Sequence, residues 1–176
     1  MRKAEYDFLT WKSFPSSAKL INDEGPGKYA FWYEYTPEAL PVKPGARLKI
    51  EVWVKQENVI YGNYPTFQEV SLRGFDGSRW KFIGRVEIPL GTFDWRKLTS
   101  EIKVPEDVYA VRWMPYIGSG TKTKPGVAWF DDLRIYQDGV LVYEDKFSNW
   151  LPYQIAGAIA LSIPTALYAI PRLKRR

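Results

Sequence analysis

The chain has 176 residues, a formal net charge of +5, and neither cysteine nor histidine. These absences exclude disulfides, thiol or Ser-His-Asp catalysis, Cys/His zinc sites and ordinary haem ligation, but they leave oxygen ligands for calcium. Aromatic residues are 16% of the chain, and its thirteen prolines and thirteen glycines are scattered, which suits one domain with a sizeable core and many turns. Two methionines, no cysteine and 26% charged residues would suit a thermophile.

Residues 1 to about 145 show strand and turn patterns, and no long stretch has helical periodicity. The clearest strand is 47–55, where Leu48, Ile50, Val52 and Val54 alternate with mostly polar residues. Hairpin turns are predicted at 74–77 and 137–139. About eight to ten strands at this spacing imply an all-β, two-sheet antiparallel β-sandwich. In chain order, the expected strands include 29–35, 47–55, 69–73, 79–87, 97–104, 109–114, 127–136 and 140–144.

The window 147–171 contains no charged residue. As a helix its 25 residues would be about 37 Å long, enough to cross the hydrocarbon core of a bilayer. We therefore expect a transmembrane helix at 149–171 after a domain at 1–148; a buried core helix is the alternative. Small residues around 156–162 would allow the helix to self-associate, so a homo-oligomer or another membrane-complex partner is possible.

Most of the excess positive charge stands in the last five residues, which contain Arg172, Lys174, Arg175 and Arg176. A basic chain raises the question of nucleic acid, but a basic cluster directly after an apolar segment is explained better by a membrane. The positive-inside rule places the tail 172–176 in the cytoplasm and the domain outside. We expect the lipid bilayer as a partner and no nucleic acid.

Three segments, in order, resemble a known family. They are Pro-Val-Lys-Pro-Gly at 41–45 leading into the strand that ends at 53–55, Asp-Trp-Arg-Lys-Leu at 94–98 followed by 104–105, and Gly-Val-Ala-Trp-Phe-Asp-Asp-Leu at 126–133. The pattern is similar to the jelly-roll carbohydrate-binding modules attached to xylanases and glucanases, especially families four, nine and twenty-two, within the wider galactose-binding-like superfamily. The resemblance covers roughly residues 20 to 137 and implies a jelly roll that binds a glycan.

A glycan platform is predicted from side chains that alternation places away from the core. Sugars stack on aromatic rings through their apolar C–H faces, and polar groups at the ring edge select hydroxyl orientation. If their strands are neighbours in one sheet, the outward residues form one mixed platform. The alternatives are that Trp53 lies under a loop or that the sheet packs against another subunit. The predicted ligand-binding residues are Trp53, Glu69, Arg73, Arg112 and Tyr116.

A structural calcium site is predicted at the adjacent acidic pair Asp131 and Asp132. In the resembling families the matching aspartate helps to hold a calcium ion between the final and the first strand. Here the other ligands would come from Asp7 or from Glu24, because calcium prefers carboxylate and carbonyl oxygens. The alternative is that Asp131 caps backbone N–H groups or pairs with an arginine.

The function that these features predict is a membrane-anchored, outward-facing, non-catalytic carbohydrate-binding module. No catalytic motif is recognisable, and Gly118-Ser-Gly120 lacks the lysine and the helix of a phosphate loop. The alternative function is a structural protein of a cell envelope, a virion membrane or a membrane complex, in which the sandwich makes protein contacts. An aromatic groove would favour the sugar, and a covered face would favour the protein partner.

Overall fold

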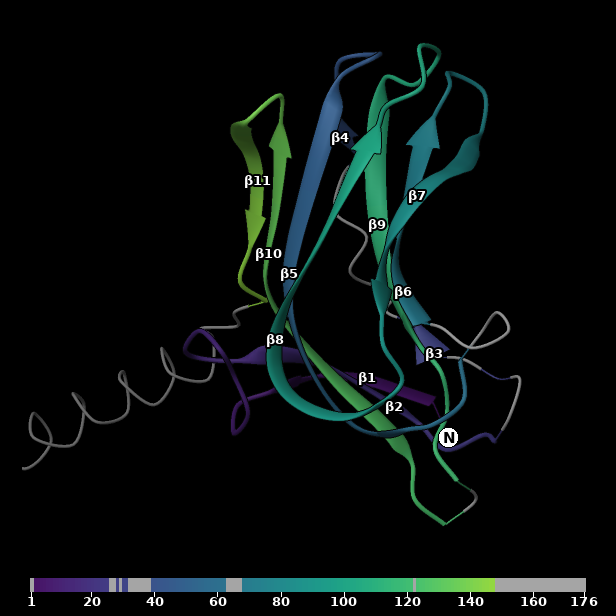
Figure 1. Ribbon diagram of the computed structural model, residues 1–176, viewed down its shortest axis with the longest axis vertical. Helices are drawn as coiled ribbons and strands as arrows, with labels where there is room; N and C mark the ends of the chain where they lie inside the picture. Colours follow the sequence, from purple (N-terminus) through teal and green to yellow (C-terminus); the bar gives the residue numbers. More distant parts are fainter. Residues whose placement is uncertain are drawn as a thin grey trace, which may run out of the picture.

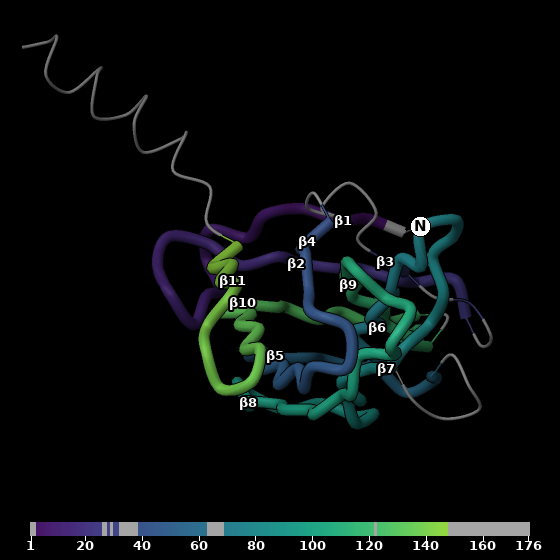
Figure 2. Tube along the Cα trace, turned by 90° about the horizontal axis from the view of Figure 1, so that it is seen from above, coloured from purple at the N-terminus to yellow at the C-terminus, as the bar shows by residue number. Residues whose placement is uncertain are grey.

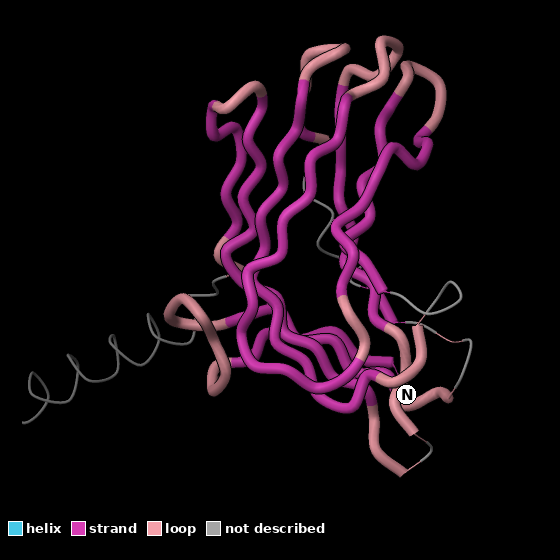
Figure 3. The backbone as a smooth tube through the Cα atoms, in the orientation of Figure 1, coloured by secondary structure: helices cyan, strands magenta, loops and turns pink. Residues whose placement is uncertain are grey.

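The computed structural model describes residues 2–25, 28, 30–31, 39–62, 68–121 and 123–147, which form strands and loops (Figure 3). The expected transmembrane segment 149–171 and the tail 172–176 lie outside the described residues. Within the described ranges, no helix is long and apolar enough to cross a membrane. The strands are β1 (Arg2–Asp7), β2 (Ser17–Asn22), β3 (Ala30–Phe31), β4 (Leu40–Pro41), β5 (Arg47–Val59), β6 (Gln68–Phe75), β7 (Trp80–Ile88), β8 (Gly91–Lys103), β9 (Ala110–Ile117), β10 (Gly126–Gln137) and β11 (Val140–Asp145).

The strands form two antiparallel sheets, as the alternation predicted. The six-stranded sheet has the order β1-β2-β10-β5-β8, with β11 paired to β10. The five-stranded sheet has the order β3-β9-β6-β7, with β4 paired to β9. The two sheets lie on opposite sides of the domain (Figure 1 and Figure 2). Because β5, β8 and β10 each return to the six-stranded sheet after strands of the other, the connections cross between the layers as in a jelly roll.

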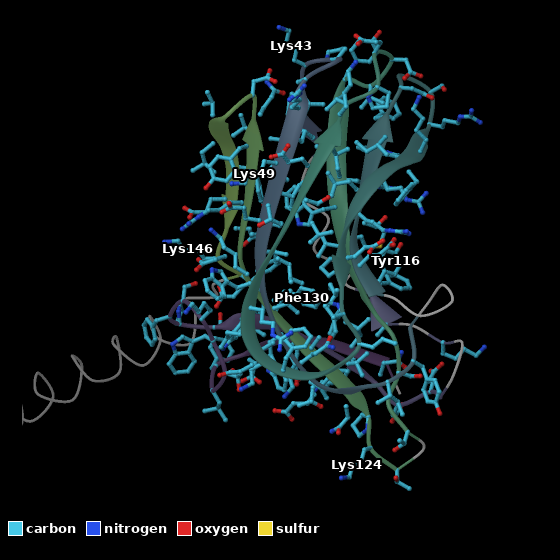
Figure 4. All side chains as sticks on the ribbon, in the orientation of Figure 1. Lys43, Lys49, Tyr116, Lys124, Phe130 and Lys146 are labelled. Carbon is cyan, nitrogen blue, oxygen red and sulfur yellow. The ribbon has the colours of Figure 1, made fainter. Side chains whose placement is uncertain are left out.

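The core lies between the two sheets and is built by the predicted alternation. In β5, Leu48, Ile50, Val52 and Val54 are at most 1% exposed, and they face inward because successive side chains of a strand point to opposite faces. Phe130 of β10 is fully buried in the same cluster and lies inside the domain in Figure 4. The other sheet contributes residues that include Val70, Leu72, Val111, Trp113 and Ile117.

The turn predicted at 74–77 is displaced by two residues in the structure. Gly74 belongs to β6, and the chain turns at 76–79, where Asp76 Oδ1 accepts hydrogen bonds from the Ser78 and Arg79 N–H groups at 3.0 and 2.9 Å. A Cβ on Gly74 would stand 2.7 Å from a methyl carbon of Val108. This glycine is therefore required by packing under a neighbouring side chain.

Candidate functional site

The outer surface of the five-stranded sheet gathers side chains from three neighbouring strands, and we call it the β9–β6–β7 face. Its rows follow from the register, in which Tyr116 lies opposite Glu69, and Arg112 opposite Arg73. Directly opposed residues of antiparallel strands share a face, so these four predicted residues do come together. The face consists of Arg112, Met114 and Tyr116 of β9, Glu69, Ser71, Arg73 and Phe75 of β6, and Trp80, Phe82, Arg85 and Glu87 of β7.

Aromatic rings stand at both ends of the β9–β6–β7 face. At one end Tyr116 and Phe31 have ring centroids 5.7 Å apart. At the other end Phe75 and Trp80 are 5.3 Å apart, and Phe82 beside them is 49% exposed. Such rings offer flat apolar surface to the C–H side of a sugar ring. Figure 4 shows Tyr116 on the β9 side of the molecule.

The polar groups of the face lie in the same rows as these aromatic rings and in the row between them. The Arg85 guanidinium is 3.2 Å from a carboxylate oxygen of Glu69 and 3.2 Å from one of Glu87. The Arg112 guanidinium carbon stands 4.3 Å from the centroid of the Trp80 ring, within the range of a cation–π contact. Planar polar groups are thus held beside aromatic rings, which is the combination that carbohydrate recognition uses.

The central row of the face is buried although it points away from the core. Ser71 is 1% and Met114 is 7% exposed, and the two residues are opposed across β6 and β9. Met114 does not belong to the hydrophobic core cluster, whereas its chain neighbour Trp113 does. The rows on either side contain the half-buried side chains Glu69, Arg73, Arg112 and Tyr116.

Trp53 does not join these residues, because β5 belongs to the six-stranded sheet. The single platform expected from the sequence required its strands to be neighbours, and they are not. Trp53 is half-buried on the outer surface of its own sheet, in the row of Asp131 and Lys97. The Lys12 ammonium lies 4.2 Å from its ring centroid. The loop between β1 and β2 thus reaches over Trp53, which was the alternative left open.

The outer surface of the six-stranded sheet neutralises much of its own charge. The Glu51 carboxylate forms ion pairs with the Nζ atoms of Lys49 and Lys97, each at 2.7 Å. Hydrogen bonds from these two lysines hold the pKa of the Glu51 carboxyl below its usual value. Arg134 pairs with Glu144 at 2.8 Å. A surface of matched ion pairs is typical of a solvated sheet face, so it is the weaker candidate for a ligand site.

The Asp131 carboxylate is a structural cap. It is fully buried and accepts hydrogen bonds from Lys12 N at 2.7 Å, Ser13 N at 2.8 Å, Ser13 Oγ at 2.7 Å and Asp132 N at 2.8 Å. Burial raises the pKa of the Asp131 carboxyl, although these donors act in the opposite direction. Asp132 has a φ of +46° at the register shift of β10, a conformation that aspartate tolerates better than most residues. The pair thus ties the β1–β2 loop to a bulge in β10.

The Asp7 carboxylate also accepts its hydrogen bonds from N–H groups of the protein. It accepts hydrogen bonds from Trp129 Nε1 at 2.7 Å, Leu9 N at 2.8 Å and Thr10 N at 3.1 Å, and it lies 3.2 Å from Lys19 Nζ. Burial raises the pKa of Asp7, but the hydrogen bonds from Trp129, Leu9 and Lys19 outweigh it and leave the pKa below its ordinary value. Trp129 is thereby held in place, as expected for a structural tryptophan.

The residues predicted to bind calcium do not fit a calcium site as the structure arranges them. Among the described residues, no three carboxylates come close enough together to hold a metal ion. Both carboxylate oxygens of Asp131 and of Asp7 accept hydrogen bonds from N–H or O–H donors of the protein. Glu24 is exposed on the loop after β2. The arrangement favours the capping alternative for Asp131.

Several residues of the face were missed by sequence reasoning, namely Phe31, Phe75, Trp80, Phe82 and Arg85. The signal for three of them lay in the predicted strand 79–87, where Trp80, Phe82 and Arg85 follow a turn. The bulge between β6 and β7, where Leu72 pairs with Gly84 but Arg73 with Phe82, shifts the alternation by one residue. Simple period-two counting therefore could not assign these side chains to a face.

No protein-family model matches the chain, and no curated protein matches it. Among solved structures, a family 16 carbohydrate-binding module is 12% identical with a TM-score of 0.54, over 77% of this chain and 86% of that one. An arabinose-bound α-L-arabinofuranosidase is 13% identical with a TM-score of 0.53, over 77% of this chain but only 22% of the enzyme.

The enzymatically active domain of tailspike protein 4 from bacteriophage CBA120 is 17% identical with a TM-score of 0.50. That match covers 81% of this chain and 18% of the tailspike chain. At such identities the similarity shows a shared architecture. The described part of this chain therefore has an all-β, jelly-roll fold that these solved structures share.

Proposed function

We propose that the chain is a non-catalytic carbohydrate-binding module whose ligand is a polysaccharide or a glycan bound on the β9–β6–β7 face. The observation that carries the proposal is the placement of Tyr116, Trp80 and Phe82 around charged planar side chains on one sheet surface. A sheet face that only contacts solvent rarely exposes so many aromatic rings. A bound sugar would contact both the rings and the polar groups beside them. The shared fold supports the proposal.

Replacing Tyr116 or Phe82 by alanine should weaken glycan binding by several-fold to about tenfold each, because each change removes one stacking surface. The measurement is titration calorimetry against a broad panel of soluble oligosaccharides, with the chain held in a detergent that has no sugar headgroup. Trp53→Ala is the matched control, since it removes an aromatic ring from the opposite sheet. Thermal melting of each variant separates lost binding from lost folding.

The same titration tests the earlier expectation that Trp53 itself stacks on the sugar. Loss of binding in Trp53→Ala, with Tyr116→Ala and Phe82→Ala unchanged, would move the site to the six-stranded sheet. A wild-type chain that binds no member of the panel would instead favour the structural alternative. The observation that supports that alternative is the edge strand β11, where Val140, Leu141 and Val142 are 66%, 47% and 37% exposed.

We propose further that the module is anchored to a bilayer by residues 149–171, with 172–176 on the cytoplasmic side. Support comes from the loop between β1 and β2, where Leu9 is 91%, Phe14 51% and Trp11 37% exposed. Ser16, at the end of this loop, donates a hydrogen bond to the Phe147 carbonyl at 2.9 Å. The exposed apolar loop thus lies where the chain enters the uncharged segment, and such side chains suit a membrane interface.

A polarity-sensitive label at position 9 should report an apolar environment when the full chain is reconstituted in vesicles. The chain has no cysteine, so Leu9→Cys provides a single attachment point. Ser78→Cys, in the β6–β7 turn, is the control and should report water. The emission of the label at position 9 should shift to shorter wavelength on reconstitution. If both positions report water, the loop does not touch the bilayer.

A further inference from the structure

Arg73 and Arg112 form a pair of like charges in the row beside the buried central row of the β9–β6–β7 face. They are directly opposed across β6 and β9, a position that places the Cβ atoms of two residues about 5 Å apart. An arginine side chain keeps its charge at every ordinary pH. Two guanidinium groups so placed repel each other, and like charges directly opposed destabilise a sheet.

No acidic side chain among the described residues compensates this pair. The two glutamates of the face, Glu69 and Glu87, both form their ion pairs with Arg85. No carboxylate of the described chain lies within ion-pair distance of Arg73 or Arg112. On the opposite sheet, Arg134 has Glu144. Among the described residues, Arg85 and Arg134 thus have acidic partners on the sheet surfaces, whereas Arg73 and Arg112 have none.

The two side chains are also partly desolvated. Both are half-buried, and the Nε atom of each is buried without a hydrogen-bond partner. A buried donor without an acceptor destabilises the folded state, and buried polar groups in native proteins nearly always have a hydrogen-bond partner. Arg112 is further held in place by the Trp80 ring at 4.3 Å. Each side chain therefore carries a buried donor that finds no acceptor among the described residues, and the Arg112 guanidinium is held against an aromatic ring.

We propose that Arg73 and Arg112 together bind an oxyanion of the ligand, a carboxylate or a sulfate group carried by an acidic saccharide. This inference rests on the proposed glycan-binding function and names the chemical class of its ligand. A planar guanidinium binds such groups through two parallel N–H···O bonds, and one anion between two arginines removes their repulsion. The ring that carries the anion lies within reach of the aromatic side chains of the same face, Trp80 and Phe82 among them.

The test compares three oligosaccharides of equal length on the full chain in a detergent without a sugar headgroup: a hexuronate, a sulfated and a neutral one. At least one acidic ligand should bind about tenfold or more tightly than the neutral one, and added salt should reduce this preference. Which acidic ligand binds identifies the source of the anion. Arg73→Gln and Arg112→Gln should each abolish the preference for the acidic ligand, because each removes one of the two guanidinium groups that hold the anion.

Arg47→Gln is the matched control, because it removes the same charge from an exposed position on the six-stranded sheet, and it should keep the preference. Equal binding of acidic and neutral ligands would overturn the anion inference and leave the glycan-binding proposal standing. If no saccharide of any kind binds, both fall. Arg73→Gln should also raise the melting temperature in the absence of ligand, because it relieves the repulsion; a fall would contradict the charge argument.

Discussion

Replacing Asp131 by alanine should lower the free energy of unfolding by about 3 kcal/mol, because four donors lose their acceptor in a buried place. The donors are the N–H groups of Lys12, Ser13 and Asp132 and the Ser13 hydroxyl. The loss also releases the β1–β2 loop from the β10 bulge. For a domain of this size the melting temperature should fall by about 10 °C.

Urea denaturation of the purified chain measures the effect, and Asp132→Asn is its control. Asparagine tolerates the positive φ of position 132, so this variant should unfold within about 0.5 kcal/mol of the wild type. A decrease in Asp132→Asn as large as in Asp131→Ala would show that the bulge, and not the cap, carries the stability.

The same melts decide the calcium question. If Asp131 acts only as a cap, calcium and excess chelator should give coincident melting curves, since only a ligand of the native state raises stability. A melting temperature that rises with calcium in the wild type but not in Asp131→Ala would restore the metal site predicted from the sequence.

The capping role of Asp131 shows why the chemistry of this position could not be read from the sequence. An adjacent acidic pair within a strand is compatible with a metal ligand or with a cap, and only the position of the other partners distinguishes the two roles. Those partners, Lys12 and Ser13, are 119 and 118 residues away along the chain. No local sequence pattern indicates a contact between residues so far apart in the chain. The calcium site was therefore predicted from the family resemblance alone.

For a related reason, the sequence could not show that Trp53 lies in a different sheet from the other predicted platform residues. Alternation in 47–55 correctly placed Trp53 outside the core, because period two reports the face on which a side chain lies. Alternation does not report the sheet to which a strand belongs. In a jelly roll the chain passes repeatedly between layers, so that β5 and β6 follow each other in sequence but lie in different sheets. Four of the five predicted ligand residues still came together, because β6 and β9 are neighbours.

Replacing Gly118 by alanine should destabilise the domain by about 4 kcal/mol, because the new methyl group has no space. Its Cβ would stand 1.5 Å from the carbonyl oxygen of Tyr61, a backbone atom that a rotamer change cannot move. Tyr61 and Ser119 form an isolated bridge with hydrogen bonds of 3.1 and 3.0 Å. Either this bridge breaks or Gly118, which follows β9 and lies two residues after Tyr116, moves away.

Gly77→Ala separates this steric effect from the general cost of losing a glycine. Gly77 has a φ of +92° and nothing within 4 Å of its ideal Cβ, so alanine there should cost only the backbone strain of about 1–2 kcal/mol. Because Gly118 lies next to the β9–β6–β7 face, Gly118→Ala should also weaken glycan binding under conditions where the variant is still folded, whereas Gly77→Ala should not. Equal destabilisation by the two changes would mean that the 60–62 loop gives way, and that its contact with Gly118 contributes little to the stability of the domain or to the shape of the face.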